Sequence, residues 1–267
     1  MALPAQAVHA QDPDAPASPR HEASRVLSAE LAMAAALAQS HELQSSPAPV
    51  SLMDKVRYDM ATAAADFAFR TAARQEEVRV YELASYFTVE NAVIPLLPAR
   101  VSGPIEDAIA GLHSLYALAG YDQYYLVHAH FTWPYTSGAT VSQLRSYYQQ
   151  AQNAYGVDWS YLASINFIES SFGRNVGPSS AGAEGPMQFL PSTWANYGQG
   201  GNIWDPHDAI MAAARYLVHY GAPGDMQQAI FHYNLDYDYV DAVEFFARAL
   251  RADPTWLDRL YYWGTIG

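Results

Sequence analysis

From Thr140 onward, residues that start and end helices recur at short intervals along the chain. Gly156 and Gly173 are typical of helix ends. Asp158 is a good N-cap, and the proline of Asp205-Pro206 suits a first helical turn. The helices predicted between these signals span residues 140–155, 159–172, 206–220, 225–233 and 237–252, with a shorter one starting at Pro191. A chain interrupted this often can form only short helices that pack on one another, so we predict an all-α fold.

The sequence before Thr140 has no motif that indicates a function. Residues 1–50 are rich in Ala, Pro, Ser and Gln, which bury little surface, so we expect a disordered or weakly structured tail with one helix over residues 23–39. Residues 51–87 lack Gly and Pro and have a helical pattern, and a loop over residues 91–104 precedes a helix over residues 105–119. The predicted parts are a tail (1–50), a helical extension (51–139) and a main domain (140–267).

The charge balance of the chain excludes several classes of partner. The sequence has 14 Lys and Arg against 27 Asp and Glu, a formal net charge of −13. Nucleic acids are bound by clustered basic residues, and anionic lipids also attract them, so neither is an expected partner. The 20 tyrosines and 6 tryptophans are mainly core candidates, but such rings also stack on sugars. An acidic chain acting on a glycan must bind it by stacking and hydrogen bonds.

Cysteine is absent, which excludes disulfides, thiolate zinc sites and cysteine nucleophiles. No run of about 18 apolar residues is present, so we expect no transmembrane segment. The first ten residues are apolar and end in Val8-His9-Ala10, which resembles the end of a signal peptide. We therefore expect the remnant of a clipped signal.

Glu169 is a carboxylate on an apolar helix face. Leu162, Ile165, Glu169 and Phe172 are spaced 3, 4 and 3 apart, which places all four on one side of the predicted helix. Burial disfavours the charged form of a carboxyl and raises its pKa. A glutamic acid that stays protonated near neutral pH can donate a proton to a glycosidic oxygen. On an isolated helix, a structural glutamate at the rim of the stripe would be the more common explanation.

The residues after this helix favour a catalytic interpretation. A Gly- and Ser-rich stretch over residues 175–185 allows the backbone to approach a ligand closely. Gln188 follows it and offers both a donor and an acceptor, which suits a sugar or an N-acetyl group. Further along, Met226, Ile230 and Tyr233 are spaced 4 and 3 apart, so Tyr233 lies on a second apolar stripe with Asn234 beside it.

Three motifs in register carry a resemblance to a known family. They are Glu169-Ser170-Ser171-Phe172, the Ser-x-x-Gly-Ala-x-Gly-x-Met-Gln-x-Leu-Pro-x-Thr pattern of residues 179–193, and Ala229-Ile230-Phe231-His232-Tyr233-Asn234. In order and spacing they resemble the lytic transglycosylases with a lysozyme-like (SLT) domain. Residues 202–217 look like a structural helix of the same family. The resemblance covers about 100 residues, and it implies a lysozyme-like, goose-type fold with the N-terminal helices as an extension.

The resemblance also implies roles for individual residues. Glu169 matches the single catalytic acid/base, and Ser179 and Gln188 match positions that contact the substrate near the scissile bond. The remaining residues expected in the substrate-binding groove are Gly185, Met187, Leu190, Tyr233, Asn234 and Tyr239. The chain departs from the common pattern because Phe231-His232 replaces smaller residues and no glycine follows Asn234. The segment Leu235-Asp236-Tyr237 instead resembles an aromatic-rich variant that leads into Tyr239.

The implied reaction is cleavage of the β-1,4 bond between N-acetylmuramic acid and N-acetylglucosamine in peptidoglycan. In this family the catalytic acid later acts as a base and closes a 1,6-anhydro ring, without a second carboxylate. A second carboxylate opposite Glu169 would instead indicate a lysozyme-type muramidase. Glu184, Asp236 and Asp238 are the candidates for it, although solvated loop acids are the simpler explanation. A non-catalytic peptidoglycan-binding module is a further alternative.

Metal chemistry is not expected. His128-Ala129-His130 could supply two ligands, but no third is identifiable. The pairs Asp12/Asp14 and Asp236/Asp238 lack the other positions of a calcium loop. We therefore expect no metal and no cofactor. The expected partner is a peptidoglycan strand bound by a monomer in the cell envelope, in the periplasm or outside the cell.

Overall fold

The structure is a computed structural model that describes residues 18–120, 138–174 and 177–263. These residues form α-helices and one 3-10 helix, with no β-strand among them and one isolated β-bridge between Glu184 and Phe189. The predicted all-α fold is confirmed. None of the described helices is long and apolar enough to cross a membrane.

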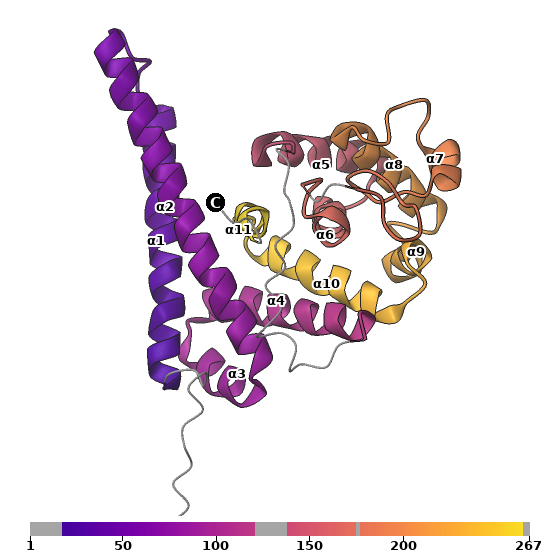
Figure 1. Ribbon diagram of the computed structural model, residues 1–267, viewed down its shortest axis with the longest axis horizontal. Coiled ribbons are helices and arrows are strands. Elements are labelled where there is room, and N and C mark those ends of the chain that lie inside the picture. Colours follow the sequence, from indigo (N-terminus) through magenta and orange to yellow (C-terminus); the bar gives the residue numbers. More distant parts are fainter. Residues whose placement is uncertain (1–17, 121–137, 175–176, 264–267) are drawn as a thin grey trace, which may run out of the picture.

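The first two helices form a long hairpin at one side of the molecule (Figure 1). Helix α1 spans Pro19–Ser45 and α2 spans Leu52–Ser85. The expectation of a weakly structured tail is wrong for residues 19–45, and the helix predicted over 23–39 is longer at both ends. The expectation from composition underestimated this helix because it did not take into account that alanine is a strong helix former. One face of the helix is also buried, and its apolar residues include Val26, Ala29, Met33 and Ala36.

A short connection leads from the hairpin into the main body. It consists of α3 (Phe87–Val93), the 3-10 helix η1 (Ile94–Leu96) and α4 (Ala99–Leu118). The loop predicted over residues 91–104 is wrong in extent because α4 begins before Pro104. Proline inside a helix removes one backbone hydrogen bond. The helix continues through it because Val101, Pro104 and Ile105 are all buried.

Among the described residues seven further helices follow, six of them close to the predicted positions. Their bounds are α5 Val141–Tyr155, α6 Trp159–Ser170, α7 Pro191–Tyr197, α8 Pro206–His219, α9 Met226–Tyr233, α10 Tyr237–Ala252 and α11 Trp256–Tyr262. Thr140 and Gln143 form a capping box at the start of α5. Helix α6 ends two residues before the predicted Phe172, because Ser171 and Phe172 both have positive φ angles. Helix α11 was not predicted.

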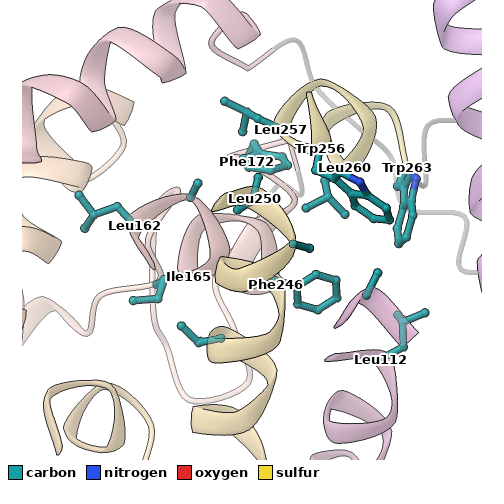
Figure 2. Close-up of a cluster of buried hydrophobic side chains, with 14 of the residues drawn as sticks. Leu112, Leu162, Ile165, Phe172, Phe246, Leu250, Trp256, Leu257, Leu260 and Trp263 are labelled. Atoms are coloured by element: carbon teal, nitrogen blue, oxygen red, sulfur yellow. The ribbon is translucent and has the colours of Figure 1, made fainter. Parts of the chain in front are cut away.

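One hydrophobic core joins α4 to the helices that follow it. Leu112 of α4, Ile165 of α6 and Phe246 of α10 belong to the same buried cluster, which Figure 2 shows together with Trp256 of α11 and Trp263 just after it. Gly111 allows α4 to approach α10 closely, since a Cβ there would lie 2.7 Å from the Phe246 ring. The predicted boundary at residue 139 therefore does not coincide with a break in the core.

Helix α11 is tied to the hairpin by a buried cluster of charges. Arg259 contacts both oxygens of Glu30 on α1, and its Nη1 lies 2.7 Å from Glu76 Oε1 on α2. Its Nη2 also lies 3.0 Å from Asp253 Oδ2, and the guanidinium carbon lies 5.2 Å from the centroid of the Trp256 ring. Because Arg259, Glu30 and Glu76 are all buried, this cluster lies inside the interface between the hairpin and the main body.

Candidate active site

Glu169 lies in the last turn of α6, at the edge of its buried face. Leu162, Ile165 and Phe172, which share its stripe in the sequence, are fully buried. Glu169 itself is half-buried, unlike these three neighbours. The helix stops one residue later, where Ser171 and Phe172 adopt left-handed backbone conformations. Such strained conformations in non-glycine residues are concentrated at functional sites.

The Glu169 carboxyl has a tyrosine as its hydrogen-bond partner. The hydroxyl of Tyr239, on α10, donates to Glu169 Oε1 at 2.6 Å. Burial raises the pKa of Glu169 to about 7, and the Tyr239 hydrogen bond works against this rise because it favours the carboxylate. The pKa of Tyr239 is raised well above its ordinary value, first by burial and then by the nearby Glu169 charge. Glu169 can therefore hold or release a proton near neutral pH, while Tyr239 remains a donor.

A second tyrosine connects this pair to the loop that follows α6. The Tyr233 ring, on α9, stacks parallel to that of Tyr239, with centroids 6.4 Å apart and an interplanar angle of 6°. Its hydroxyl donates to the Met187 carbonyl at 2.7 Å. The Glu169 charge helps to raise the pKa of Tyr233, after burial, which indicates that the two groups are close. The sequence-predicted residues Glu169, Tyr233 and Tyr239 are thus brought together.

The loop contains a tight turn, Gly185–Gln188, closed by the backbones of Glu184 and Phe189. These two residues exchange hydrogen bonds of 2.9 and 3.0 Å. Gly185 has a φ of +75°, and a Cβ there would lie 2.0 Å from the Ile203 carbonyl oxygen, so no other residue fits. Gln188 also has a positive φ, and its side-chain Nε2 donates to the Gly185 carbonyl at 3.0 Å. The turn is therefore a compact unit that fixes the position of Gln188.

Polar side chains of α6 hold this turn by hydrogen bonds. Asn166 Nδ2 and Ser170 Oγ donate to the Pro186 carbonyl at 2.8 and 2.5 Å. The hydroxyl of Tyr148, on α5, donates to Asn166 Oδ1 at 2.6 Å. Sequence reasoning assigned no role to Asn166 or Tyr148. The available signal was a polar Asn166 between apolar residues of a helix predicted to be buried.

The other predicted groove residues have varied surroundings. The Ser179 hydroxyl accepts hydrogen bonds from the backbone of Ala181 and Ala183, at 3.2 and 3.0 Å, and so shapes its own loop. Leu190 precedes α7 and Asn234 follows α9, and both are exposed. The Met187 side chain is fully buried, which leaves its carbonyl as the group that faces Tyr233. The predicted substrate contacts of these residues stay predictions.

The three candidate second carboxylates show no sign of acting on Glu169. The raised pKa of Glu169 comes from burial, opposed by Tyr239, without repulsion from another acid among the described residues. Asp236 is the N-cap of α10, where its side chain accepts a hydrogen bond from the Asp238 backbone. The backbone of Glu184 is held in the bridge to Phe189. Among these four acids, Glu169 is the one whose pKa is raised by burial.

One group of residues has the spacing of metal ligands. Asp205, His207 and Asp208 place ligand atoms within 4.8 Å of one another at the start of α8. Asp205 caps this helix through the Asp208 backbone N–H at 3.0 Å, and Asp208 accepts from the Asn202 backbone at 2.9 Å. These contacts account for both carboxylates as structural groups. His128 and His130, like Asp12 and Asp14, lie outside the described residues.

Comparison with known proteins assigns the region around Glu169 to a family. Residues 146–236 match the family model of the transglycosylase SLT domain. Over 124 residues the chain is 28% identical to a protein named membrane-bound lytic murein transglycosylase F from Thiobacillus denitrificans. The aligned region covers 43% of this chain and 26% of that protein. The chain thus spans about a quarter of the length of this relative. No solved structure matches the chain.

These findings confirm the resemblance that the motifs indicated. Residues 146–236 match a transglycosylase SLT domain, which is lysozyme-like, and the described residues have the all-α fold expected of it. The matched region includes Glu169, the Gly185–Gln188 turn and Tyr233. Tyr239, the partner of Glu169, lies three positions beyond its end, on the helix that also packs against α4.

Proposed function

We propose that this SLT domain is a peptidoglycan lytic transglycosylase that cleaves the β-1,4 bond between N-acetylmuramic acid and N-acetylglucosamine. The observation that carries the proposal is the state of Glu169. The residue is half-buried, and burial raises the pKa of its carboxyl to about 7. The SLT family match and the murein transglycosylase relative support the same activity and substrate.

In this mechanism Glu169 acts twice. As an acid it donates its proton to the glycosidic oxygen, which leaves as the hydroxyl of the departing sugar. The substrate's own acetamido group then stabilises the positive anomeric carbon. The Glu169 carboxylate, stabilised by the Tyr239 hydroxyl at 2.6 Å, takes the proton of the muramyl 6-hydroxyl. That oxygen bonds to the anomeric carbon and closes the 1,6-anhydro ring, so Glu169 is protonated again.

The groove residues have supporting roles in the proposal. Gln188, held in its turn, and the exposed Asn234 offer amide groups that can hydrogen-bond an N-acetyl substituent. The net charge of −13 is compatible with binding through stacking and hydrogen bonds. We further propose that the protein acts in the cell envelope, where this substrate is found, and as a monomer.

Digestion of purified sacculi tests the proposal. Wild-type protein should release muropeptides that end in 1,6-anhydro-muramic acid, which mass spectrometry detects as products one water lighter than hydrolysis products. The Glu169→Gln protein, which keeps the shape of the side chain, should release none. Release of reducing muramyl ends alone would identify a muramidase. Binding of sacculi without cleavage by the wild type would identify a binding module.

A further inference from the structure

Two consecutive carbonyl groups of the Gly185–Gln188 turn are held by different helices. The Pro186 carbonyl accepts from Asn166 and Ser170 of α6, and the Met187 carbonyl accepts from Tyr233 of α9. Ser170 is the neighbour of Glu169 in the chain, and Tyr233 stacks on the tyrosine that contacts Glu169. The turn is therefore fastened both to α6, which carries Glu169, and to α9.

Asn166 is itself fixed in orientation. Its side chain is fully buried, as is that of Tyr148, whose hydroxyl donates to Asn166 Oδ1 at 2.6 Å. Because Oδ1 is occupied by this donor, Nδ2 faces the Pro186 carbonyl at 2.8 Å. Burying an amide and a phenol costs free energy unless both are hydrogen-bonded, and an apolar side chain would avoid that cost. The Asn166 amide is therefore specifically placed to hydrogen-bond the turn.

We propose that Asn166, oriented by Tyr148, is a positioning residue that holds the Gly185–Gln188 turn in register with Glu169. This inference rests on the proposed transglycosylase function and deepens it. Asn166 acts through the turn: it fixes the Pro186 carbonyl, which fixes the backbone of Gln188 two residues later. Ser170 shares the carbonyl but is held by the end of α6, where its hydroxyl also accepts from the Gly173 backbone at 2.7 Å. Asn166 adds the tie to α5.

The test is a double-mutant cycle between Asn166 and Gln188. Asn166→Leu keeps the branching of the side chain at Cγ and removes the amide, and Gln188→Asn shortens the side chain while tolerating the left-handed backbone. We expect Asn166→Leu to lower kcat/KM about 10- to 100-fold in the wild-type background, because Gln188 loses its position. In the Gln188→Asn background the same change should cost less than about threefold, since both act through one turn. The high-pH limb set by Glu169 should stay in place.

Two further variants keep the test decisive. Asn166→Leu leaves the buried Tyr148 hydroxyl without its acceptor, so Tyr148→Phe/Asn166→Leu, which removes both polar groups, serves if the single variant does not fold. Ile165→Val is the matched control: it trims the buried neighbour of Asn166 in α6 and leaves the turn untouched. It should keep kcat/KM within about twofold. Equal losses from Asn166→Leu in both Gln188 backgrounds would show a merely structural role and overturn the inference.

Hydrogen exchange separates this inference from the proposed function. The Gln188 and Phe189 backbone amides donate to Gly185 and Glu184 inside the turn. In Asn166→Leu these two amides should exchange at least tenfold faster, while the α8 amides remain as protected as in wild type. Unchanged exchange in the turn overturns the inference even if activity falls. If wild-type protein cleaves no glycan, the proposed function fails, and exchange alone decides whether Asn166 holds the turn.

Discussion

Glu169 in the site and Glu76 in the hairpin both retain protons more strongly than an exposed glutamate. Burial is the first cause of the raised pKa in each case. Their partners differ. Glu76 is fully buried, lies 2.7 Å from the Arg259 guanidinium and is repelled by Glu30. Glu169 is only half-buried as a residue, and its carboxyl contacts a neutral tyrosine. A raised pKa therefore does not by itself identify a catalytic acid; access to a substrate and the absence of a competing cation do.

The largest difference should appear when each glutamate is made neutral. Glu169→Gln should lower the rate of muropeptide release from sacculi by about 10²–10⁴-fold, because the proton donor is lost. Glu76→Gln should keep the rate within about twofold at temperatures where the protein is folded, because the amide still accepts from Arg259. Chromatographic quantification of released muropeptides measures both. Equal losses in the two variants would remove the distinction between the two carboxyls.

Removing the Arg259 cation should lower the stability of the fold far more than removing an exposed cation. Arg259→Met leaves Glu30 and Glu76 buried without their counter-ion, which typically costs about 3–5 kcal/mol and lowers Tm by about 6–20 °C. The matched control is Arg248→Met, which breaks an exposed ion pair between α10 and Asp107 of α4 and should cost about 0–1 kcal/mol. Thermal unfolding followed by circular dichroism measures the difference. Similar Tm values for both variants would contradict the structural role of the Arg259 cluster.

These two regions also differ in how far they could be predicted from sequence. The site could be predicted because Glu169 and Tyr233 lie on apolar stripes and their motifs are in register with those of a known family. The Arg259 cluster could not be predicted, because Glu30, Glu76 and Arg259 are distant in sequence, and a charged residue on a helix is usually solvated. The helix α1 was underestimated for a related reason. Its stability depends on burial against α2, which local composition does not reveal.

The pH dependence of stability should sharpen the comparison further. Both carboxyls have folded-state pKa values above the ordinary 4.5, so each contributes stability that is complete at acid pH and is lost as pH rises through its folded value. For Glu169 this loss begins near pH 4.5, the ordinary value, and is complete above about pH 7, the folded-state value. Glu169→Gln should therefore be more stable than wild type at pH 8.5, by about 1–3 kcal/mol, and similar at pH 4. Urea unfolding at the two pH values measures the change.

Glu76→Gln should show the same sign, with stability relative to wild type rising as pH rises above the ordinary glutamate range. Its gain is accompanied by full activity, whereas the gain in Glu169→Gln is accompanied by inactivity. A stabilising substitution that abolishes function is expected at a catalytic position. Loss of stability in Glu169→Gln at pH 8.5 would mean that the carboxylate is favourable in the fold, contrary to the effect of burial.

The smallest effect is expected from removing the Tyr239 hydroxyl, the hydrogen-bond partner of Glu169. Tyr239→Phe keeps the ring stacked on Tyr233 and removes the hydrogen bond to Glu169 Oε1. That hydrogen bond favours the carboxylate, so its loss should raise the pKa of Glu169 and move the high-pH limb of kcat/KM upward from about 7. The maximal kcat should fall about tenfold, because a hydrogen bond to a charged group contributes about 1.5–3 kcal/mol. Tyr261→Phe, whose hydroxyl donates to the Ala139 carbonyl, is the control and should leave the limb in place. If the limb stays in place in Tyr239→Phe too, a group other than Glu169 controls it.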